Sequence, residues 1–376
     1  NLNKRDYLWT IYINELPSND TDRLVQLIQM YDRGEKLEET KEKQIELLLT
    51  LFGWLLSSSN RWLRDYTSKA MLEILKEHFQ LCEIILRKFE KVNDPYIIQR
   101  LYGIVFGACC KRTDDRGNQA LAEYVYHTVF EQEKVYPDIL LRDYARLIIE
   151  RFLYEHSEYT GMIERKKIVP PYNSDPIPEI EDQRYLEKHY DGAMFWLIHS
   201  MRFEGMGMYG DFGRYVFQSA LHNFDVDDKT MFNYAVYYIQ EELGFSEEYF
   251  GEHDQHCGSY DRHQSIKTER IGKKYQWITM YNMLARISDH CKMVDHWNYP
   301  EKEDVKFEGA WEPYIRDFDP TLNQSFMICK EAPRFTILDE FLTKGQEENK
   351  AADISTADAQ KTWLGTKGIF LNKLKD

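Results

Sequence analysis

The residues best suited to chemistry lie in one short polar stretch of the second half of the chain. It contains, in order, Glu252, His253, Asp254, His256, Cys257, Asp261 and His263. Imidazole, thiolate and carboxylate groups bind zinc, and a bound zinc ion activates water for hydrolysis. The spacing lacks the glutamate of an HExxH motif and the paired cysteines of a structural zinc site. A polar surface loop is therefore favoured, and a metal-dependent hydrolase using these histidines with Asp254 is the alternative.

Two glycine-containing segments could hold phosphate, but neither matches a nucleotide-binding motif. The first segment is punctuated by Gly205, Gly207, Gly210 and Gly213. A dinucleotide fingerprint would follow a strand within a βαβ unit, and no strand pattern precedes this segment. The second, Gly272-Lys273-Lys274, lacks the first glycine of a Walker A motif and the Ser or Thr after its lysine. No cofactor is predicted.

Three tracts place charged residues among aromatic residues, with glycines as well in the first two, a mixture that suits a polar network in a packed core. They run from Tyr209 to Leu221, from Glu269 to Ile278 and from Arg316 to Asp319. Their network candidates are Asp211, Arg214, Glu269, Arg270, Lys273, Lys274, Arg316, Asp317 and Asp319. We expect the basic residues of the second tract to contact Asp211 or the carboxylates of the third. The interpretation is structural, with no catalytic residue assigned.

The arginines of these tracts, Arg214, Arg270 and Arg316, are expected to be buried, each beside a carboxylate. Removing one partner of a buried ion pair costs about 3–5 kcal/mol. The sequence therefore predicts that Arg270→Ala unfolds the second half of the chain rather than weakening a contact with a ligand.

Aromatic residues in and near the same tracts are candidate contacts with a partner protein. The candidates are Tyr209, Tyr215, Trp277 and Trp311. Aromatic residues make up 14% of the chain, including 26 tyrosines, and such side chains dominate binding hot spots as well as cores. A protein-binding module is therefore favoured, and a scaffold or oligomerisation domain is a further alternative.

The elements that must position these residues are predicted to be helices. Apolar residues recur at helical spacing in segments 21–31, 45–56, 185–201, 212–221, 230–243 and 269–290. Asp211 is expected to cap the helix that follows it. The fold class predicted from this pattern is all-α.

An internal repeat organises the first half. Leu63-Arg64-Asp65-Tyr66 recurs as Leu141-Arg142-Asp143-Tyr144, with a looser copy at Gln99-Arg100-Leu101-Tyr102 between them. Each copy follows a polar or proline-containing break and opens a helix. A period near 40 residues with two helices per unit is typical of armadillo and HEAT repeats. We expect a HEAT/armadillo/TPR-like solenoid, with the Arg–Asp neighbours forming a structural ladder between repeats.

Composition changes divide the chain into four regions. Residues 1–160 are the expected helical-repeat region, and a Pro-rich connector spans 161–183. An irregular helical domain is predicted over 184–343, followed by a polar tail with a short terminal segment over 344–376. The prolines of the connector are Pro170, Pro171, Pro176 and Pro178.

Charge and cysteine content narrow the class of partner and the compartment. The 376 residues carry a net charge of −15, which makes nucleic acid an unexpected partner. The six cysteines form no CxxC pair, which favours a reducing, cytoplasmic environment. No apolar run approaches the ~20 residues of a membrane span. Because the chain begins with Asn1, a fragment of a longer protein is expected.

The three tracts also carry a resemblance to a known family. The segments are Tyr209-Gly210-Asp211-Phe212-Gly213-Arg214-Tyr215, Glu269-Arg270-Ile271-Gly272-Lys273-Lys274-Tyr275-Gln276-Trp277 and Arg316-Asp317-Phe318-Asp319-Pro320-Thr321. Together they resemble the C-terminal region of bacterial antiviral STAND NTPases, the NLR-like proteins called Avs. The resemblance covers roughly residues 180–330, and the helical-repeat region before it also fits.

The resemblance implies the function of a sensor. In that family an N-terminal effector and a central NTPase precede a helical sensor, which recognises a phage protein such as the large terminase subunit or the portal. Recognition triggers oligomerisation and effector activity. The expected partners are therefore a phage protein and upstream domains of the same polypeptide. No NTPase motif occurs in this chain, so the fragment itself is not expected to be an enzyme.

Overall fold

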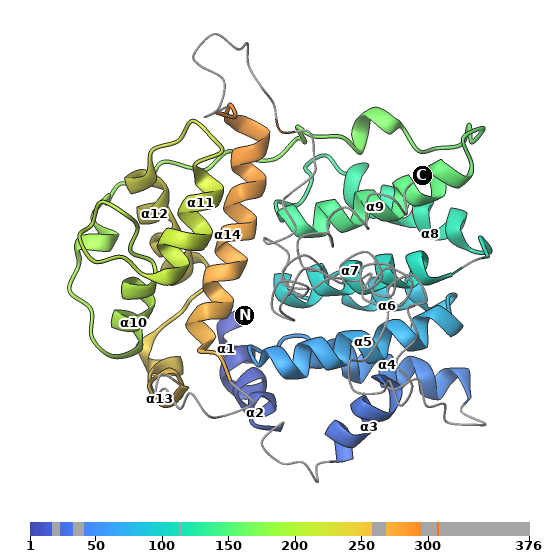
Figure 1. Cartoon of the computed structure of the whole chain (residues 1–376), viewed down its shortest axis with the longest axis horizontal. Helices are drawn as coiled ribbons and strands as arrows, with labels where there is room; N and C mark the ends of the chain where they lie inside the picture. The colour runs from blue at the N-terminus through green and yellow to red at the C-terminus, as the bar shows by residue number, and fades with distance from the viewer. Residues whose placement is uncertain (17–22, 33–40, 113, 258–267, 295–306, 308–376) are drawn as a thin grey trace, which may run out of the picture. The chain divides into compact units, whose positions relative to one another are not determined.

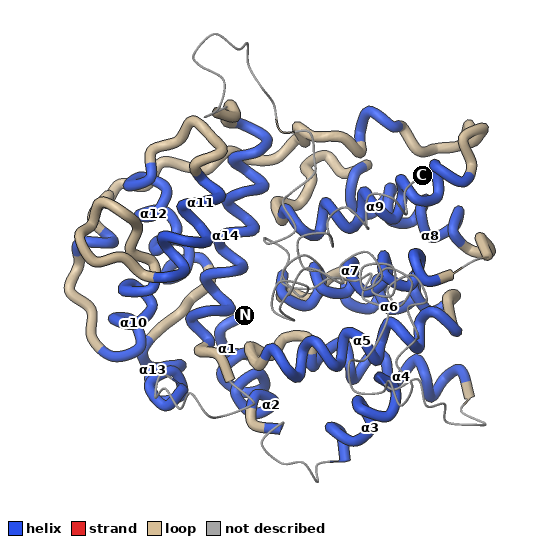
Figure 2. The backbone as a smooth tube through the Cα atoms, in the orientation of Figure 1, coloured by secondary structure: helices blue, strands red, loops and turns tan. Residues whose placement is uncertain are grey.

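The structure is a computed structural model that describes residues 1–16, 23–32, 41–112, 114–257, 268–294 and 307. All of these belong to one unit, Asn1–Ser325, and the second unit, Phe326–Asp376, lies outside the described residues. The described residues form helices and loops, with two isolated β-bridges and no strand (Figure 2). The predicted all-α class is therefore confirmed for this part of the chain.

The helices of the first half form two packed layers. Their bounds are α3 (Arg23–Asp32), α4 (Glu42–Leu55), α5 (Arg61–Glu77), α6 (Leu81–Phe89), α7 (Pro95–Lys111), α8 (Asn118–Val125) with the π-helix Tyr126–Phe130, and α9 (Ile139–Glu155). Helices α3, α5, α7 and α9 pack side by side in one layer, and α4, α6 and α8 pack in the other (Figure 1). Each layer buries apolar side chains against the other.

The polar breaks between repeat copies are helix caps. The Asn60 side chain accepts a hydrogen bond from the Leu63 amide at the start of α5. Asp94 caps α7 and Asp138 caps α9 in the same way. Such side chains satisfy amides that have no partner within the helix. The prediction that each repeat copy opens a helix is confirmed.

The arginines of the three sequence copies are buried near the starts of three helices, four residues after the cap in α5 and α9 and six after it in α7. Arg64, Arg100 and Arg142 have exposed fractions of 1%, 2% and 1%. The Arg100 guanidinium lies 3.2 Å from the Asp65 carboxylate, an ion pair between α7 and α5. The Arg64 guanidinium instead lies 3.5 Å from the centre of the Tyr96 ring. The burial is shared, but the partner differs from one helix to the next.

The N-terminal segment and the second half supply the remaining elements. These are α1 (Leu2–Arg5), the π-helix Asp6–Thr10, α2 (Ile11–Asn14), α10 (Gly192–Ser200), the π-helix Phe212–Phe217, α11 (Gln218–Leu221), α12 (Asp228–Tyr237), the π-helix Tyr238–Glu242, α13 (Glu247–Cys257) and α14 (Ile271–His290). Short 3₁₀ helices occur at Arg165–Lys167 and Tyr185–Glu187, and the segment around the first of these is otherwise irregular, as its prolines predict.

Three local predictions require correction. The helix expected over 185–201 is interrupted, because Gly192 has a φ of 57° and α10 begins there. Asp211 does not cap the following helix, since its own backbone is helical and its side chain makes no cap hydrogen bond. The polar stretch expected to form a loop is helical through Cys257, the last residue of α13.

Helix α14 crosses the N-terminal ends of α5, α7 and α9 (Figure 1). Thr268, just before it, forms a bridge with Asn60, and the Asn282 side chain donates to the Pro137 carbonyl, 2.9 Å away. Between these two contacts, the Lys274 ammonium donates a hydrogen bond to the Asp94 carboxylate. Along the axis of α14, Lys274 and Asn282 lie about 12 Å apart. Packed helices lie about 8–10 Å apart, so residues about two turns apart on α14 can contact neighbouring helices. One face of α14 therefore meets successive helices of the layer.

The C-terminal end of α14 is fixed by a buried ion pair. Arg142 Nη1 lies 2.8 Å from Asp289 Oδ2, and both side chains are buried. Arg142 also donates to the carbonyls of Tyr136 and Val135, while Asp289 accepts from the Tyr172 amide. The pair thus joins α9, α14 and the Pro-rich connector.

Arg142→Met is predicted to lower the free energy of unfolding by about 3–5 kcal/mol, because it leaves the Asp289 carboxylate buried without its cation. The matched control is Lys134→Met, which removes an ion pair with Asp175 whose two side chains are exposed. Urea denaturation measures both variants. An Arg142→Met variant as stable as the Lys134→Met control would contradict the assignment.

Candidate functional site

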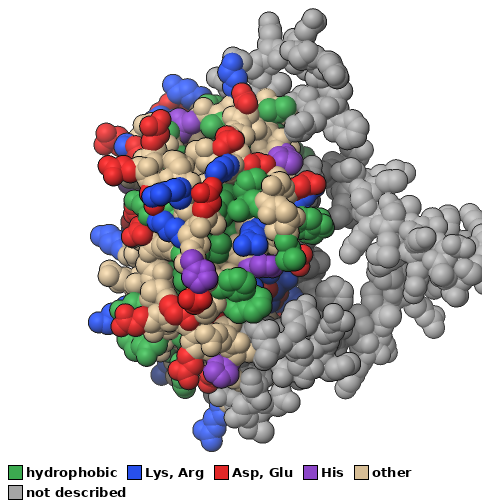
Figure 3. All heavy atoms as spheres, turned by 90° about the vertical axis from the view of Figure 1, so that its left-hand side faces the viewer, with side chains coloured by type: hydrophobic (Ala, Val, Ile, Leu, Met, Phe, Trp, Pro, Cys, Tyr) green, Lys and Arg blue, Asp and Glu red, His purple; other side chains and the backbone are tan. Residues whose placement is uncertain are grey.

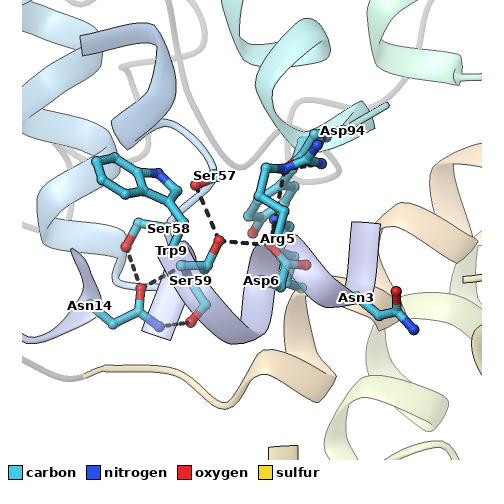
Figure 4. A network of polar contacts seen from close by, with 12 residues as sticks. Asn3, Arg5, Asp6, Trp9, Asn14, Ser57, Ser58, Ser59 and Asp94 are labelled. Carbon is cyan, nitrogen blue, oxygen red and sulfur yellow. Dashed lines mark hydrogen bonds and ion pairs between the residues drawn. The ribbon is translucent and has the colours of Figure 1, made fainter. Parts of the chain in front are cut away.

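A cluster of fully buried charges lies where the N-terminal segment, α7 and α14 meet. Lys274 Nζ lies 2.7 Å from Asp6 Oδ1 and 2.9 Å from Asp94 Oδ2, and all three side chains have an exposed fraction of 0%. Arg5 Nη2 lies 3.2 Å from Asp94 Oδ2 and supplies the second positive charge (Figure 4). Two cations thus balance two carboxylates. No substrate can reach these buried groups, so their role is to join three segments.

A chain of hydroxyl and amide groups extends the cluster toward α5. The Thr10 hydroxyl donates to Asp6 Oδ1 at 2.7 Å and also contacts the Ser57 hydroxyl. Asn14 bonds the hydroxyls of Ser58 and Ser59 (Figure 4). Ser59 in turn donates to the Glu269 carbonyl at 2.7 Å. The serines that follow α4 therefore form a polar junction between the N-terminal segment and the start of α14.

The protonation of the cluster depends on its balance of charges. Burial raises the pKa of Asp6; the Lys274 ammonium opposes that rise, and the neighbouring Asp94 carboxylate adds to it. Removing the lysine would therefore leave Asp6 with the two influences that favour its neutral form. Lys274 therefore favours the ionised form of Asp6.

The structure brings few of the predicted network residues together. Lys274 is buried, but its carboxylate partners are Asp6 and Asp94 rather than Asp211 or the tract at 316–319. Glu269 is half-buried and joins the network through its backbone carbonyl; Lys273 is also half-buried. Asp211 is exposed. The candidates Arg316, Asp317 and Asp319 lie outside the described residues.

The expected burial of arginines is wrong for two of them. Arg214 is half-buried and pairs with Glu204 at 2.7 Å, near the surface. Arg270 is half-buried at the N-cap of α14, and no carboxylate among the described residues forms an ion pair with it. Of the basic residues in this tract, only Lys274 points into the core, so it replaces Arg270 as the residue whose loss should unfold this region.

The sequence does not identify the two carboxylates that form ion pairs with Lys274. In the sequence, Asp94 stands out only as a polar residue before a predicted helix. In the structure it caps α7 and also accepts a hydrogen bond from Lys274. Asp6 lies in a short N-terminal helical segment beside Tyr7, Leu8 and Trp9. A lone carboxylate among large apolar residues was the available signal of a buried charge.

The histidine-rich stretch contains the residue that caps the start of α14. Asp254 accepts hydrogen bonds from the amides of Ile271 at 2.6 Å and Gly272 at 2.8 Å, so it caps α14 from a neighbouring helix. His253 Nδ1 lies 2.9 Å from Asp254, while His256 Nδ1 contacts the Glu252 carbonyl. His263 lies outside the described residues. Within the described part of the chain, no three potential ligands of the His, Cys, Asp or Glu types gather at one point.

Exposed aromatic and apolar side chains lie on α10 and on the segment after it, which packs against the end of α10 at Gly210. We call this set the aromatic patch: Phe195, Trp196, Met208, Tyr209 and Tyr215, with exposed fractions from 41% to 67%. The Tyr209 and Tyr215 rings are perpendicular at 5.7 Å, and their hydroxyls are 3.1 Å apart. Figure 3 shows the face that carries α10, with hydrophobic side chains beside histidines and charged groups.

A close backbone approach joins the two halves of the aromatic patch. A Cβ atom at Gly210 would overlap the carbonyl oxygens of His199 and Ser200, so only glycine lets the loop lie against the end of α10. The Gly210 amide also donates to the Arg202 carbonyl at 2.9 Å. Tyr209 is thereby held next to the helix that carries Phe195 and Trp196.

The aromatic patch rests on α14 through buried rings. Phe212, which is buried, meets the half-buried Trp277 of α14 edge-to-face at 5.2 Å. Trp277 also stacks on Tyr281 at 5.5 Å. Of the predicted partner contacts, Tyr209 and Tyr215 are therefore accessible, whereas Trp277 is engaged in packing. Trp311 lies outside the described residues.

A separate cleft of about 510 Å³ opens between the α6–α7 turn and the segment that follows α8. Tyr102, Tyr124 and Tyr136 contribute to its lining, together with apolar side chains. Polar groups of the lining bond to acidic neighbours: Tyr124 donates to Glu90, and His127 contacts Glu131. Because these polar groups of the cleft already have partners, the aromatic patch is the stronger candidate for binding.

Comparison with known proteins adds no family assignment. No protein-family model, no curated protein and no solved structure matches the chain. Among the helices the structure describes, none has the length and apolar character needed to cross a membrane. The function must therefore be argued from the residues themselves.

Lys274→Met is predicted to lower the free energy of unfolding by about 3–5 kcal/mol, because Asp6 and Asp94 remain buried with less compensating charge. The double variant Lys274→Met, Asp6→Leu should be more stable than Lys274→Met alone, since Asp94 keeps its ion pair with Arg5. Urea denaturation of both variants and of Asp6→Leu completes a double-mutant cycle. Strictly additive losses would contradict the coupling.

The stability contributed by His253 is predicted to disappear at alkaline pH. Although burial lowers its pKa, the hydrogen bonds with Asp254 and Cys257 raise the pKa of His253 from 6.5 to about 9. Its contribution is therefore fully present below pH 6.5 and is lost as pH rises through about 9. Compared with His253→Gln, the wild-type protein should lose about 3 kcal/mol over this interval. Parallel stability curves for the two proteins would refute this.

Proposed function

We propose that this chain is the target-recognition region of a bacterial anti-phage STAND NTPase, and that it binds a phage protein of the terminase or portal class. The observation that carries the proposal is the aromatic patch, an accessible group of large apolar side chains on a braced helical frame. The sequence resemblance of the tracts around Tyr209 and Glu269 supports the family. Binding would activate the upstream NTPase and effector domains of the same polypeptide in the cytoplasm.

The composition of the aromatic patch suits protein recognition. Exposed Trp, Tyr and Phe side chains supply most of the binding energy at protein interfaces, where they fill pockets on the partner. Contacts between patch rings, such as Phe195 against Trp196 at 5.3 Å, restrict their rotation before binding. Side chains that are already ordered lose less entropy when a partner binds.

The charges around the aromatic patch indicate the chemistry of the partner. Asp191 and Asp211 are exposed in the segments that carry it, Glu204 is paired with Arg214, and the whole chain carries a net charge of −15. A partner surface with an apolar pocket and a basic rim would complement this arrangement. We therefore propose that the phage protein presents basic residues around the pocket that receives the patch.

The helices of the first half are the part of the fold that is expected to form a repeat array. We propose that α3 to α9 form a HEAT/armadillo/TPR-like solenoid, followed by an irregular helical domain. Two features support it: the layered packing of alternate helices, and the burial of Arg64, Arg100 and Arg142 near the starts of their helices. In such an array each unit stacks only on its neighbours and presents an extended surface.

Replacing Trp196 and Tyr209 by Ala together should weaken target binding at least about tenfold, because both are exposed members of the aromatic patch. The chain is incubated with purified phage terminase large subunits and portal proteins, and retained protein is quantified by pull-down. Tyr154→Ala is the matched control, since Tyr154 is 88% exposed on α9, outside the patch.

Two results would overturn different parts of the proposal. Retention of neither terminase nor portal from any tested phage by the wild-type chain would remove the proposed target class. Binding that survives the double substitution, or falls equally in the Tyr154→Ala control, would show that the aromatic patch is not the contact surface.

A further inference from the structure

Cys257 lies beside a histidine that is itself held by a carboxylate. The Cys257 sulfur is 3.6 Å from Nε2 and 3.7 Å from Nδ1 of His253, one helical turn earlier in α13. His253 Nδ1 is in turn 2.9 Å from Asp254 Oδ1. Cys257 is half-buried, whereas His253 is largely covered. The arrangement resembles the thiol–imidazole–carboxylate order that activates a cysteine.

Three other described thiols have surroundings that differ from those of Cys257. Cys82 and Cys109 are buried, and burial raises the pKa of both thiols, in the case of Cys109 to about 12. Cys291 is half-buried like Cys257, but burial and the nearby Asp225 carboxylate raise the pKa of its thiol. Cys291 is therefore an internal comparison: a thiol of similar accessibility with an anion, rather than an imidazole, nearby.

A positively charged imidazole stabilises a neighbouring thiolate, which is the reactive form of cysteine. The Asp254 carboxylate keeps His253 charged, because the hydrogen bonds with Asp254 and Cys257 raise the pKa of His253 to about 9 despite the opposing effect of burial. The imidazolium is thus present at neutral pH beside the sulfur. The short distance between the imidazole and the sulfur and the positive charge of the imidazole both favour a reactive cysteine.

We propose that Cys257 is a site of reversible oxidation by hydroperoxides, activated by His253. The thiolate sulfur attacks one peroxide oxygen, so an S–O bond forms as the O–O bond breaks. The sulfur loses two electrons and becomes a sulfenic acid, while the departing hydroxide takes a proton and leaves as water or, from an organic peroxide, the alkoxide leaves as an alcohol. One thiol then condenses with the sulfenic acid to form a disulfide and water, and exchange with a second thiol returns the cysteine to its reduced state.

Oxidation at this position acts on the start of α14. The added oxygen atom changes the group that faces His253, because it takes the place of the sulfur contact with the imidazole. Asp254, which bonds His253, also caps α14 through the amides of Ile271 and Gly272. The oxidised protein should therefore unfold at a lower temperature than the reduced protein. This consequence does not depend on the proposed target protein.

The first test measures thiol reactivity in the folded wild-type chain. A brief pulse of iodoacetamide at neutral pH is followed by peptide-resolved mass spectrometry, which reads each cysteine separately. Cys257 should be alkylated at least about tenfold faster than Cys291. Equal rates would overturn the proposal, and this comparison requires no variant.

Two substitutions on α13 separate activation from general disturbance of the helix. His253→Gln should slow alkylation of Cys257 about tenfold and leave Cys291 unchanged. His256→Gln is the matched control, because His256 is exposed on the same helix and contacts the Glu252 carbonyl. Equal slowing in both variants would overturn the role of His253. Alkylation of the buried Cys82 would reveal a variant that has unfolded.

The oxidation step is tested with hydrogen peroxide and dimedone, which traps sulfenic acids. The adduct should form at Cys257 and not at Cys291, and peroxide should lower the melting temperature of the wild-type protein but not that of Cys257→Ser. Rapid alkylation without a dimedone adduct would overturn the oxidation step. An equal loss of melting temperature in Cys257→Ser would overturn the link to α14.

Discussion

A lysine ammonium with no access to solvent is the constraint on which the rest of the structure depends. Burying such a charge is unfavourable unless opposite charges surround it at hydrogen-bonding distance. Lys274 meets this condition only when Asp6 from the N-terminal segment and Asp94 from the start of α7 both face it. Few relative positions of these three segments satisfy all the charges at once. The cluster therefore specifies how α14 is placed more than it adds to stability.

The placement of α14 determines where the aromatic patch lies. Asp254 caps its N-terminal end, Lys274 fixes its first turn, and the Arg142–Asp289 pair fixes its last turn. The patch is attached to this helix by the contact of Phe212 with Trp277. The accessible aromatic side chains thus stand on a frame that is held at both ends. A preformed surface of this kind suits recognition of a folded partner.

The sequence predicted local structure well because local rules govern it. Helix starts at Asn60, Asp94 and Asp138 follow from capping chemistry within a few residues. The partners of Lys274 could not be predicted, since Asp6 and Asp94 lie 268 and 180 positions away. Several basic residues are close together in this tract, and packing alone selects the one that enters the core. Likewise Tyr209 and Trp277 look equivalent in sequence, but one is exposed and the other packed.

The most direct test of the account is hydrogen–deuterium exchange of the wild-type chain and Lys274→Met under native conditions. If the buried charges join three segments, amide protection should fall together in 2–14, in α14 and at the start of α7. Helix α8, which lies in the other layer, should keep its protection. Loss of protection confined to the turn around residue 274, with 2–14 unchanged, would contradict the claim that this lysine holds the segments together.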